Sequence, residues 1–158
     1  MFAFQESLEF DVPASAVWPY LVAFEQVPLW EHGVLEVRQV TPHPVGIGTR
    51  VTARRVYAGR ETRLEGPVVE FVDGRSATIA LRGGPHVESR VTYEVEPTAS
   101  GRSRVTYRAT GQLRGPLRLL DPILPAVGRA EARKNLVRLR RRIAAGIPPD
   151  ADMPTPDP

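Results

Sequence analysis

The sequence predicts an α+β fold in which a seven-stranded curved antiparallel sheet wraps around one long C-terminal helix. The tetrapeptide Arg-Val-Thr-Tyr occurs at 90–93 and again at 104–107, across a spacer rich in turn-forming residues. Both copies alternate polar and apolar residues, as half-buried strands do. Downstream the apolar period becomes helical, with one face formed by Ala132, Leu136, Leu139 and Ile143. A sheet with one apolar face and a single long helix can enclose a space between them.

The length and composition indicate one domain followed by a short tail. A chain of 158 residues can bury a core of its own. We assign residues 1–146 to this domain and expect 147–158, which are acidic and proline-rich, to form a disordered tail. The N-terminus does not read as a signal peptide, and the most apolar early stretch, 12–24, is too short to cross a bilayer. These features favour a cytoplasmic protein.

The charge is basic but modest, with a sequence pI of about 9.8 and a net charge of +3. Lys134 is the only lysine, so nearly all cationic side chains are arginines. Arginine suits bidentate contacts with phosphate or carboxylate, but so complete a bias in a chain rich in Pro, Ala and Gly is also what GC-rich coding produces. Since net charge governs non-specific association and not a site, we expect no specific nucleic-acid partner.

The first third of the chain predicts one strand and two short helices. Residues 2–10 alternate apolar and polar side chains and read as a strand. Residues 11–15 contain an early proline and small polar residues, which is typical of a helix start. Val17, Trp18 and Leu21 then fit one face of a short helix, and Pro28 separates it from a second helical turn that ends at Trp30.

From residue 34 onward the pattern is strand after strand, followed by one helix. The expected strands are 34–41, 49–58, 61–72, 75–82, 86–96 and 103–113. Asp73-Gly74 is a strong hairpin signal, and the short connections predict an antiparallel meander. The final element starts near 115–116. Pro122 and Pro125 should kink or restart it, so we expect a short helical turn and then a straight helix over 126–145.

Five segments resemble a known superfamily. They are the helix start at 12–18, the bend at 24–30 that ends in tryptophan, Gly-Ile-Gly-Thr-Arg at 46–50, and the start and seam of the closing helix at 115–120 and 136–139. Together they resemble the START-like superfamily, also called SRPBCC or Bet v 1-like, and more narrowly its polyketide cyclase/dehydrase and lipid-transport branch. The resemblance covers nearly everything before the tail and implies a helix-grip fold with a cavity between sheet and closing helix. It is weaker for function, because this fold hosts lipid carriers, cyclases, hormone receptors and co-chaperones.

Strand alternation and the expected helix faces together predict which side chains line such a cavity. Our candidate ligand-binding residues are Trp30, Arg55, Tyr57, Ile79, Tyr93, Tyr107, Leu120, Leu124 and Val127. The hydroxyls of Tyr93 and Tyr107 could bind a polar group of a ligand or could be satisfied within the protein. Trp30 could equally be a packing residue or lie at the cavity mouth.

Arg55 and Glu6 are the two charged residues that break the apolar pattern. Arg55 shares its parity with Val51 and Tyr57, while Glu6 shares a face with Phe4. If Arg55 faces inward, it could pair with a ligand carboxylate or with Glu6, because a buried unpaired charge is costly. The alternative is a frayed strand end that leaves both side chains in water.

The sequence contains no recognisable catalytic or metal-binding motif. His32, His43 and His86 lie in or beside predicted loops, none with a second ligand at metal-binding spacing, and there is no cysteine. We therefore assign no metal, no cofactor and no catalytic residue. Cyclases of the superfamily shape a flexible substrate with a few polar groups, a part that Arg55, Tyr93 and Tyr107 could play.

Three functions remain open on the sequence alone. The first is binding of a small hydrophobic molecule such as a lipid, a polyketide or another aromatic or isoprenoid compound. The second is a polyketide aromatase/cyclase or dehydrase-like enzyme that uses the same cavity. The third is an interaction module that acts through the basic C-terminal helix. That helix could also make transient contact with a membrane surface, through Arg129, Arg133, Arg140 and Arg141.

Overall fold

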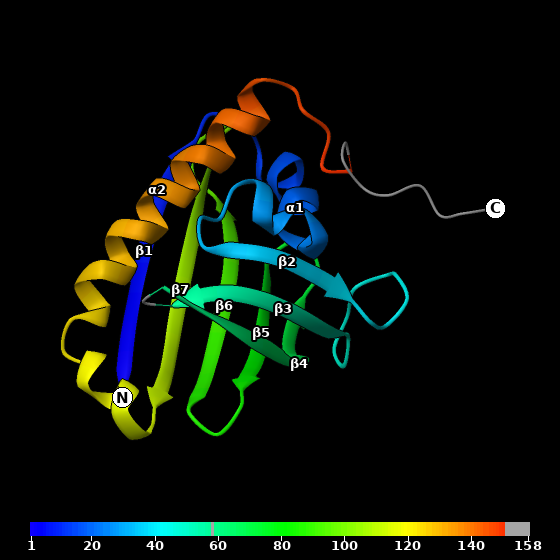
Figure 1. The fold of residues 1–158 in the computed structure, drawn as a ribbon. Helices are drawn as coiled ribbons and strands as arrows, with labels where there is room; N and C mark the ends of the chain where they lie inside the picture. The colour runs from blue at the N-terminus through cyan, green and yellow to red at the C-terminus, as the bar shows by residue number, and fades with distance from the viewer. Residues whose placement is uncertain (58, 151–158) are drawn as a thin grey trace.

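In the described part of the chain, a curved antiparallel sheet packs around one long helix (Figure 1). The computed structural model describes residues 1–57 and 59–150. Its strands are β1 (Phe2–Phe10), β2 (Val34–Gln39), β3 (Arg50–Tyr57), β4 (Arg60–Val72), β5 (Ser76–Gly83), β6 (Val87–Pro97) and β7 (Ser103–Leu113). Its helices are α1 (Ala14–Val22), the 3₁₀ helix η1 (Phe24–Leu29), the 3₁₀ helix η2 (Gly115–Leu120) and α2 (Leu124–Ala144). The predicted helix-grip architecture and element order are confirmed.

The strand order β1-β7-β6-β5-β4-β3-β2 brings the first and last strands together. Phe2 of β1 lies opposite Gly111 of β7, and Phe10 lies opposite Ser103. Figure 1 shows α2 alongside β1 and α1 beside the other end of the strands. The concave face of the sheet is therefore covered at two places, by α2 along one edge and by α1 with η1 at one end.

The core lies between this concave face and the helices. Strand alternation buries Val95 and Val105 on neighbouring strands, and the same core contains Leu136 and Leu139 of α2, which are 1% and 0% exposed. The predicted seam of the closing helix is thus the face that packs inward. At the far end, Trp18 of α1 packs on Phe71 and donates from Nε1 to Asp73 Oδ1 at 3.0 Å.

The bounds of some elements differ from those predicted. The closing helix begins at Leu124, two residues earlier than expected, because Pro125 lies in its first turn, where a missing amide hydrogen costs no hydrogen bond. The strand expected at 34–41 ends at Gln39, and the one expected at 49–58 begins at Arg50. Ala58 and residues 151–158, most of the predicted tail, lie outside the described residues. Among the described helices, none is both long and apolar enough to cross a membrane.

Candidate functional site

A cavity of about 450 Å³ lies between the concave face of the sheet and the start of the closing helix. Its walls are mostly apolar and come from β1, β3 to β7, η2 and α2, with Phe4, Leu64, Val91, Leu113, Leu120 and Leu124 among them. Its polar lining is formed chiefly by Glu31, Arg55, Tyr57, Tyr107 and Asn135. A pocket of this size and character is typical of small-molecule sites.

Six of the nine candidate residues line this cavity and three do not. The six are Arg55, Tyr57, Tyr107, Leu120, Leu124 and Val127. Ile79 is buried opposite Val68 and Val91 in the sheet, and Trp30 packs edge to face on Tyr93 with 5.8 Å between the ring centroids. These three are buried but belong to the filled part of the interior.

The cavity occupies only one end of the concave face. On β6, Val87 and Val91 line it, whereas Val95 is fully buried in the core. On β1, Phe4 lines it, whereas Phe10 is fully buried. Side chains of α1 and η1 fill the end of the sheet that these core residues occupy. The hollow therefore remains at the end covered by η2 and the first turns of α2.

A buried carboxylate organises the polar part of the cavity. Glu31, in the loop between η1 and β2, is 3% exposed. Arg55 donates from Nη1 to Glu31 Oε1 at 3.4 Å, and Tyr93 donates from its hydroxyl to Glu31 Oε2 at 3.1 Å. Arg55 thus faces inward and pairs with Glu31. The pair with Glu6 considered above is wrong: Glu6 instead accepts from Arg133 of α2 at 3.3 Å, because its strand lies directly under that helix.

The rings around Glu31 form a continuous aromatic group. The Tyr93 and Tyr107 ring centroids are 5.6 Å apart, and Phe4 lies 6.1 Å from Tyr107. The Arg55 guanidinium lies 5.3 Å from the centroid of the Tyr57 ring. Stacking and cation–π contacts of this kind fix the orientation of the polar groups that reach the cavity.

The electrostatics of this group keep its donors protonated. Burial, with the Glu31 carboxylate as the next cause, raises the pKa of Tyr107 and that of Tyr93 well above the ordinary phenol value. Burial also raises the pKa of Tyr57. Burial alone would lower the pKa of Arg55, but Glu31 and the neighbouring tyrosines together raise it. Near neutral pH the cavity therefore presents neutral phenol groups and a charged guanidinium.

Glu31 and Asn135 are the site residues that sequence reasoning missed. Asn135 lies on α2, where its Oδ1 accepts from the backbone N–H of His32 at 3.0 Å and thereby ties the loop of Glu31 to the closing helix. Glu31 follows a helical turn and precedes a strand, so no periodicity marks its orientation. The β2–β3 register that pairs Val34 with Arg55 brings this loop to Arg55, and a register shift between Val34 and Glu36 keeps that pairing from being counted off along the sequence.

At the rim of the cavity a histidine lies beside a carboxylate. His32 Nδ1 lies 3.6 Å from Glu131 Oε2, and both residues line the cavity beside Asn135. Within the residues that the structure describes, no cluster of three or more His, Cys, Asp or Glu side chains could hold a metal ion.

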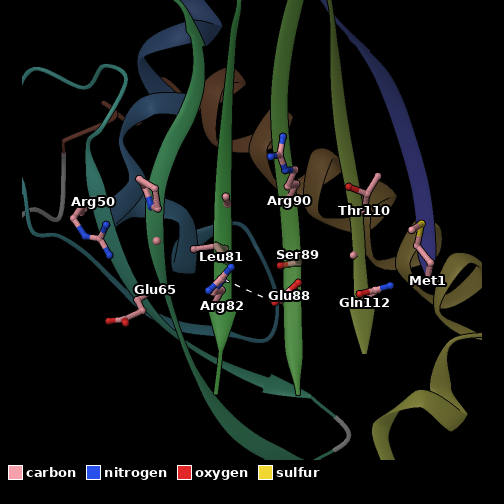
Figure 2. Close-up of a pocket in the computed structure, with 14 residues that line it drawn as sticks. Met1, Arg50, Glu65, Leu81, Arg82, Glu88, Ser89, Arg90, Thr110 and Gln112 are labelled. Carbon is pink, nitrogen blue, oxygen red and sulfur yellow. Dashed lines mark ion pairs between the residues drawn. The ribbon is translucent and has the colours of Figure 1, made fainter. Parts of the chain in front are cut away.

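A second hollow, of about 710 Å³, lies on the other side of the sheet (Figure 2). Its lining includes the charged side chains of Arg50, Glu65 and Arg90, and Arg82 lies 4.0 Å from Glu88. Ala80 and two glycines, Gly66 and Gly111, lie among its lining residues and leave space between the longer side chains. It lacks buried polar groups of the kind that surround Glu31, so we take the inner cavity as the candidate site.

Comparisons with known proteins agree with this architecture. The model of the family described as "Polyketide cyclase / dehydrase and lipid transport" matches residues 1–144. No match was found among curated protein sequences.

Solved structures with this fold are numerous. A Thermus thermophilus protein, TTHA0849, has 18% identity and a TM-score of 0.76, covering 92% of this chain and 99% of its own. A START superfamily protein from Mycobacterium smegmatis has 11% identity, a TM-score of 0.76 and the same coverage. The Zhui aromatase/cyclase from Streptomyces sp. R1128 has 12% identity and a TM-score of 0.74, covering 92% of this chain and 95% of its own. At these identities the likeness is one of fold.

Proposed function

The chain belongs to the polyketide cyclase/dehydrase and lipid-transport family of the START-like (SRPBCC) superfamily, and from this membership we propose that it binds a small hydrophobic molecule in the inner cavity. The observation that carries the proposal is a mostly apolar cavity with a localised group of polar side chains. Apolar walls favour a ligand in proportion to the apolar surface it buries. The polar groups would fix which part of the ligand lies deepest.

The chemistry of that polar group favours a neutral acceptor on the ligand. Arg55, Tyr57 and Tyr107 supply N–H and O–H donors at the cavity wall, and their pKa shifts keep them protonated. The charge of Arg55 is already matched by Glu31 at 3.4 Å. A ketone or hydroxyl can accept from these donors without adding a second negative charge, so we propose a carbonyl- or hydroxyl-bearing aromatic, polyketide or isoprenoid ligand.

Native mass spectrometry of the purified protein, followed by organic extraction, tests whether a ligand co-purifies. A neutral ketone fluorophore, 6-propionyl-2-dimethylaminonaphthalene, then serves as a defined probe. We expect Tyr107→Phe to weaken probe binding about two- to tenfold, the usual range for one hydrogen bond. Tyr93→Phe is the matched control, because it removes a buried hydroxyl near Glu31 that does not line the cavity. Absence of both co-purifying ligand and probe binding would contradict the proposal, as would equal effects of the two substitutions.

A second candidate function is acid–base catalysis in the same cavity. The observation that favours it is the convergence of Arg55 and Tyr93 on the Glu31 carboxylate, with Tyr107 in ring contact with Tyr93. Glu31 would accept a proton from the carbon next to a ligand ketone, while Arg55 and Tyr107 stabilise the resulting enolate oxygen. Return of the proton to carbon restores the ketone, and loss of a neighbouring hydroxyl as water would give dehydration.

Deuterium exchange separates catalysis from binding alone. In D₂O, a catalytic site should place deuterium on the propionyl CH₂ of the bound fluorophore, which mass spectrometry detects. Glu31→Gln should abolish this exchange, and Glu61→Gln, an exposed carboxylate that pairs with Arg54, should leave it unchanged. Probe binding without exchange would argue for a binding protein only.

A further inference from the structure

The exposed apolar side chains near the cavity mouth form a distinct surface. Leu119, Ile123 and Val127 are 84%, 54% and 52% exposed, and all three lie within η2, the start of α2 and the turn between them. The segment 115–129 contains no aromatic ring and no Ser, Thr, Asn or Gln. Large aliphatic side chains gathered at one place on a surface usually mark a contact with something apolar. We call Leu119, Ile123 and Val127 the apolar rim.

The apolar rim is continuous with the cavity. Ile123 and Val127 also line the cavity, together with Leu120 and Leu124, which are less exposed. The same short segment therefore carries aliphatic side chains from the outer surface to the interior. A hydrophobic molecule that moved along it would remain in contact with apolar atoms.

Positive charge flanks the apolar rim. Arg118 and Arg129 are exposed, and neither makes an ion pair within residues 1–57 and 59–150. The two acidic residues nearby are already paired: Asp121 with the N-terminal ammonium at 3.1 Å, and Glu131 with Lys134 at 3.7 Å and with His32. The surface is therefore apolar at its centre and cationic at its margin.

The other arginines of the closing helix differ from Arg118 and Arg129 in their contacts or in their position. Arg133 pairs with Glu6, and Arg140 donates to the backbone oxygen of Glu9 at 3.3 Å, so both reach back to β1. Arg141 lies in the last turn, at the end away from the cavity mouth. Of these arginines on η2 and the closing helix, Arg118 and Arg129 are therefore the ones that accompany exposed aliphatic side chains without an ion pair in the described ranges.

We propose that the apolar rim, with Arg118 and Arg129, docks on a bilayer that contains anionic lipid. Aliphatic side chains beside arginines suit the boundary between acyl chains and anionic headgroups. A symmetric contact with a second copy would gather two copies each of Arg118 and Arg129 at one interface, and three aliphatic side chains are few for a stable dimer. This surface lies outside the polar part of the cavity, so the inference goes beyond the proposed ligand.

Vesicle sedimentation tests the proposal on the full chain. We expect binding to vesicles of phosphatidylcholine with one quarter phosphatidylglycerol to exceed binding to pure phosphatidylcholine, and to fall in 0.5 M NaCl. Leu119→Asn should weaken binding about tenfold. Arg118→Gln and Arg129→Gln should each weaken it about fivefold. Leu119 does not line the cavity, so ligand binding should survive its substitution.

The matched controls lie elsewhere on the surface. Ile47→Asn removes an exposed aliphatic side chain that is 73% exposed in the loop between β2 and β3, and Arg90→Gln removes a cation on the outer face of the sheet. Neither should change vesicle binding. The proposal is overturned if the anionic vesicles bind no better than neutral ones, if the controls reduce binding equally, or if light scattering shows a Leu119-dependent dimer. Probe binding to the cavity without vesicle binding would overturn this inference alone and leave the proposed function standing.

Discussion

At the scale of single residues, the Glu31–Arg55 pair is the most consequential contact in the molecule. Glu31 is almost fully buried, and its carboxylate is compensated by a guanidinium and a phenol hydroxyl. A buried charged side chain is no longer solvated by water, so it is stable only while its charged or hydrogen-bonding partners remain. The same pair that could orient a ligand is therefore also a structural requirement.

Removing one partner of this pair should be costly. We expect Glu31→Ala to lower the free energy of unfolding by about 3 kcal/mol, since Arg55 would remain largely buried without its carboxylate. Glu61→Ala breaks the exposed pair with Arg54 and should cost less than about 1 kcal/mol. Urea denaturation followed by circular dichroism measures both. Equal, small losses would mean that water solvates Arg55 in the cavity and that Glu31 is structurally dispensable.

At the scale of elements, the approach of α2 to β1 sets one wall of the cavity. Gly128 of α2 lies over Phe4, and a Cβ at this position would come within 2.3 Å of the phenyl ring. Phe4 also lines the cavity. The glycine thus lets the helix lie close to the strand, although glycine in a helix interior is unfavourable compared with alanine by about 1 kcal/mol.

Gly128→Ala should couple packing to ligand binding. The added methyl group must displace the Phe4 ring, and we expect a net loss of about 1 kcal/mol in stability together with weaker binding of the ketone fluorophore. The double variant Gly128→Ala/Phe4→Leu should recover the stability, because the smaller side chain removes the clash. Thermal unfolding and probe titration are the two measurements. A Gly128→Ala variant that gained stability and kept its affinity would show that α2 can simply move outward.

The strands and helices themselves were predictable because each carries its own period. Val91, Tyr93 and Val95 on one strand and Val105 and Tyr107 on the next were placed on the inward face by alternation alone, and they are buried. The division of that face into filled core and open cavity was not predictable in this way. It depends on how far α1 and η1 reach over the sheet, which is a property of packing between elements and not of any one segment.

Contacts between elements also explain why Glu31 was not predicted as the partner of Arg55. Strand parity allowed Arg55 to face inward but left a solvated strand end as the alternative, and its partner was sought on another strand, where Glu6 shares the apolar face. Glu31 lies in a connecting loop, where backbone dihedral angles follow no repeat. Only the register of the β2–β3 hairpin brings that loop to Arg55.

At the scale of the whole molecule, the buried tyrosines should make the folded protein less stable at alkaline pH. The pKa values of Tyr57, Tyr93 and Tyr107 are raised in the folded protein, chiefly by burial. Their contribution to stability is complete below the unfolded phenol pKa, about 10, and is lost as pH rises, because only the unfolded chain can then release these protons.

We therefore expect the free energy of unfolding to fall above pH 10 by up to about 1.4 kcal/mol per pH unit for each of these tyrosines. Guanidinium denaturation at pH 8, 9, 10 and 11 measures the slope. Tyr107→Phe should reduce the slope of unfolding free energy against pH by the contribution of one tyrosine, and Tyr93→Phe should do the same. A slope that neither substitution changes would mean that other groups govern alkaline unfolding.

The pairing of β1 with β7 also has a consequence for synthesis of the chain. Phe2 leaves the ribosome long before its strand partner Gly111, which is 109 positions later in the sequence. At translation rates of about 5–20 residues per second, β1 waits roughly 5–20 s for its neighbour. During that interval its alternating phenylalanines are available to other nascent chains, and so distant a pairing is also slow to form. Recovery of intact protein from a cell should therefore depend on how quickly β7 is synthesised as well as on the stability of the finished fold.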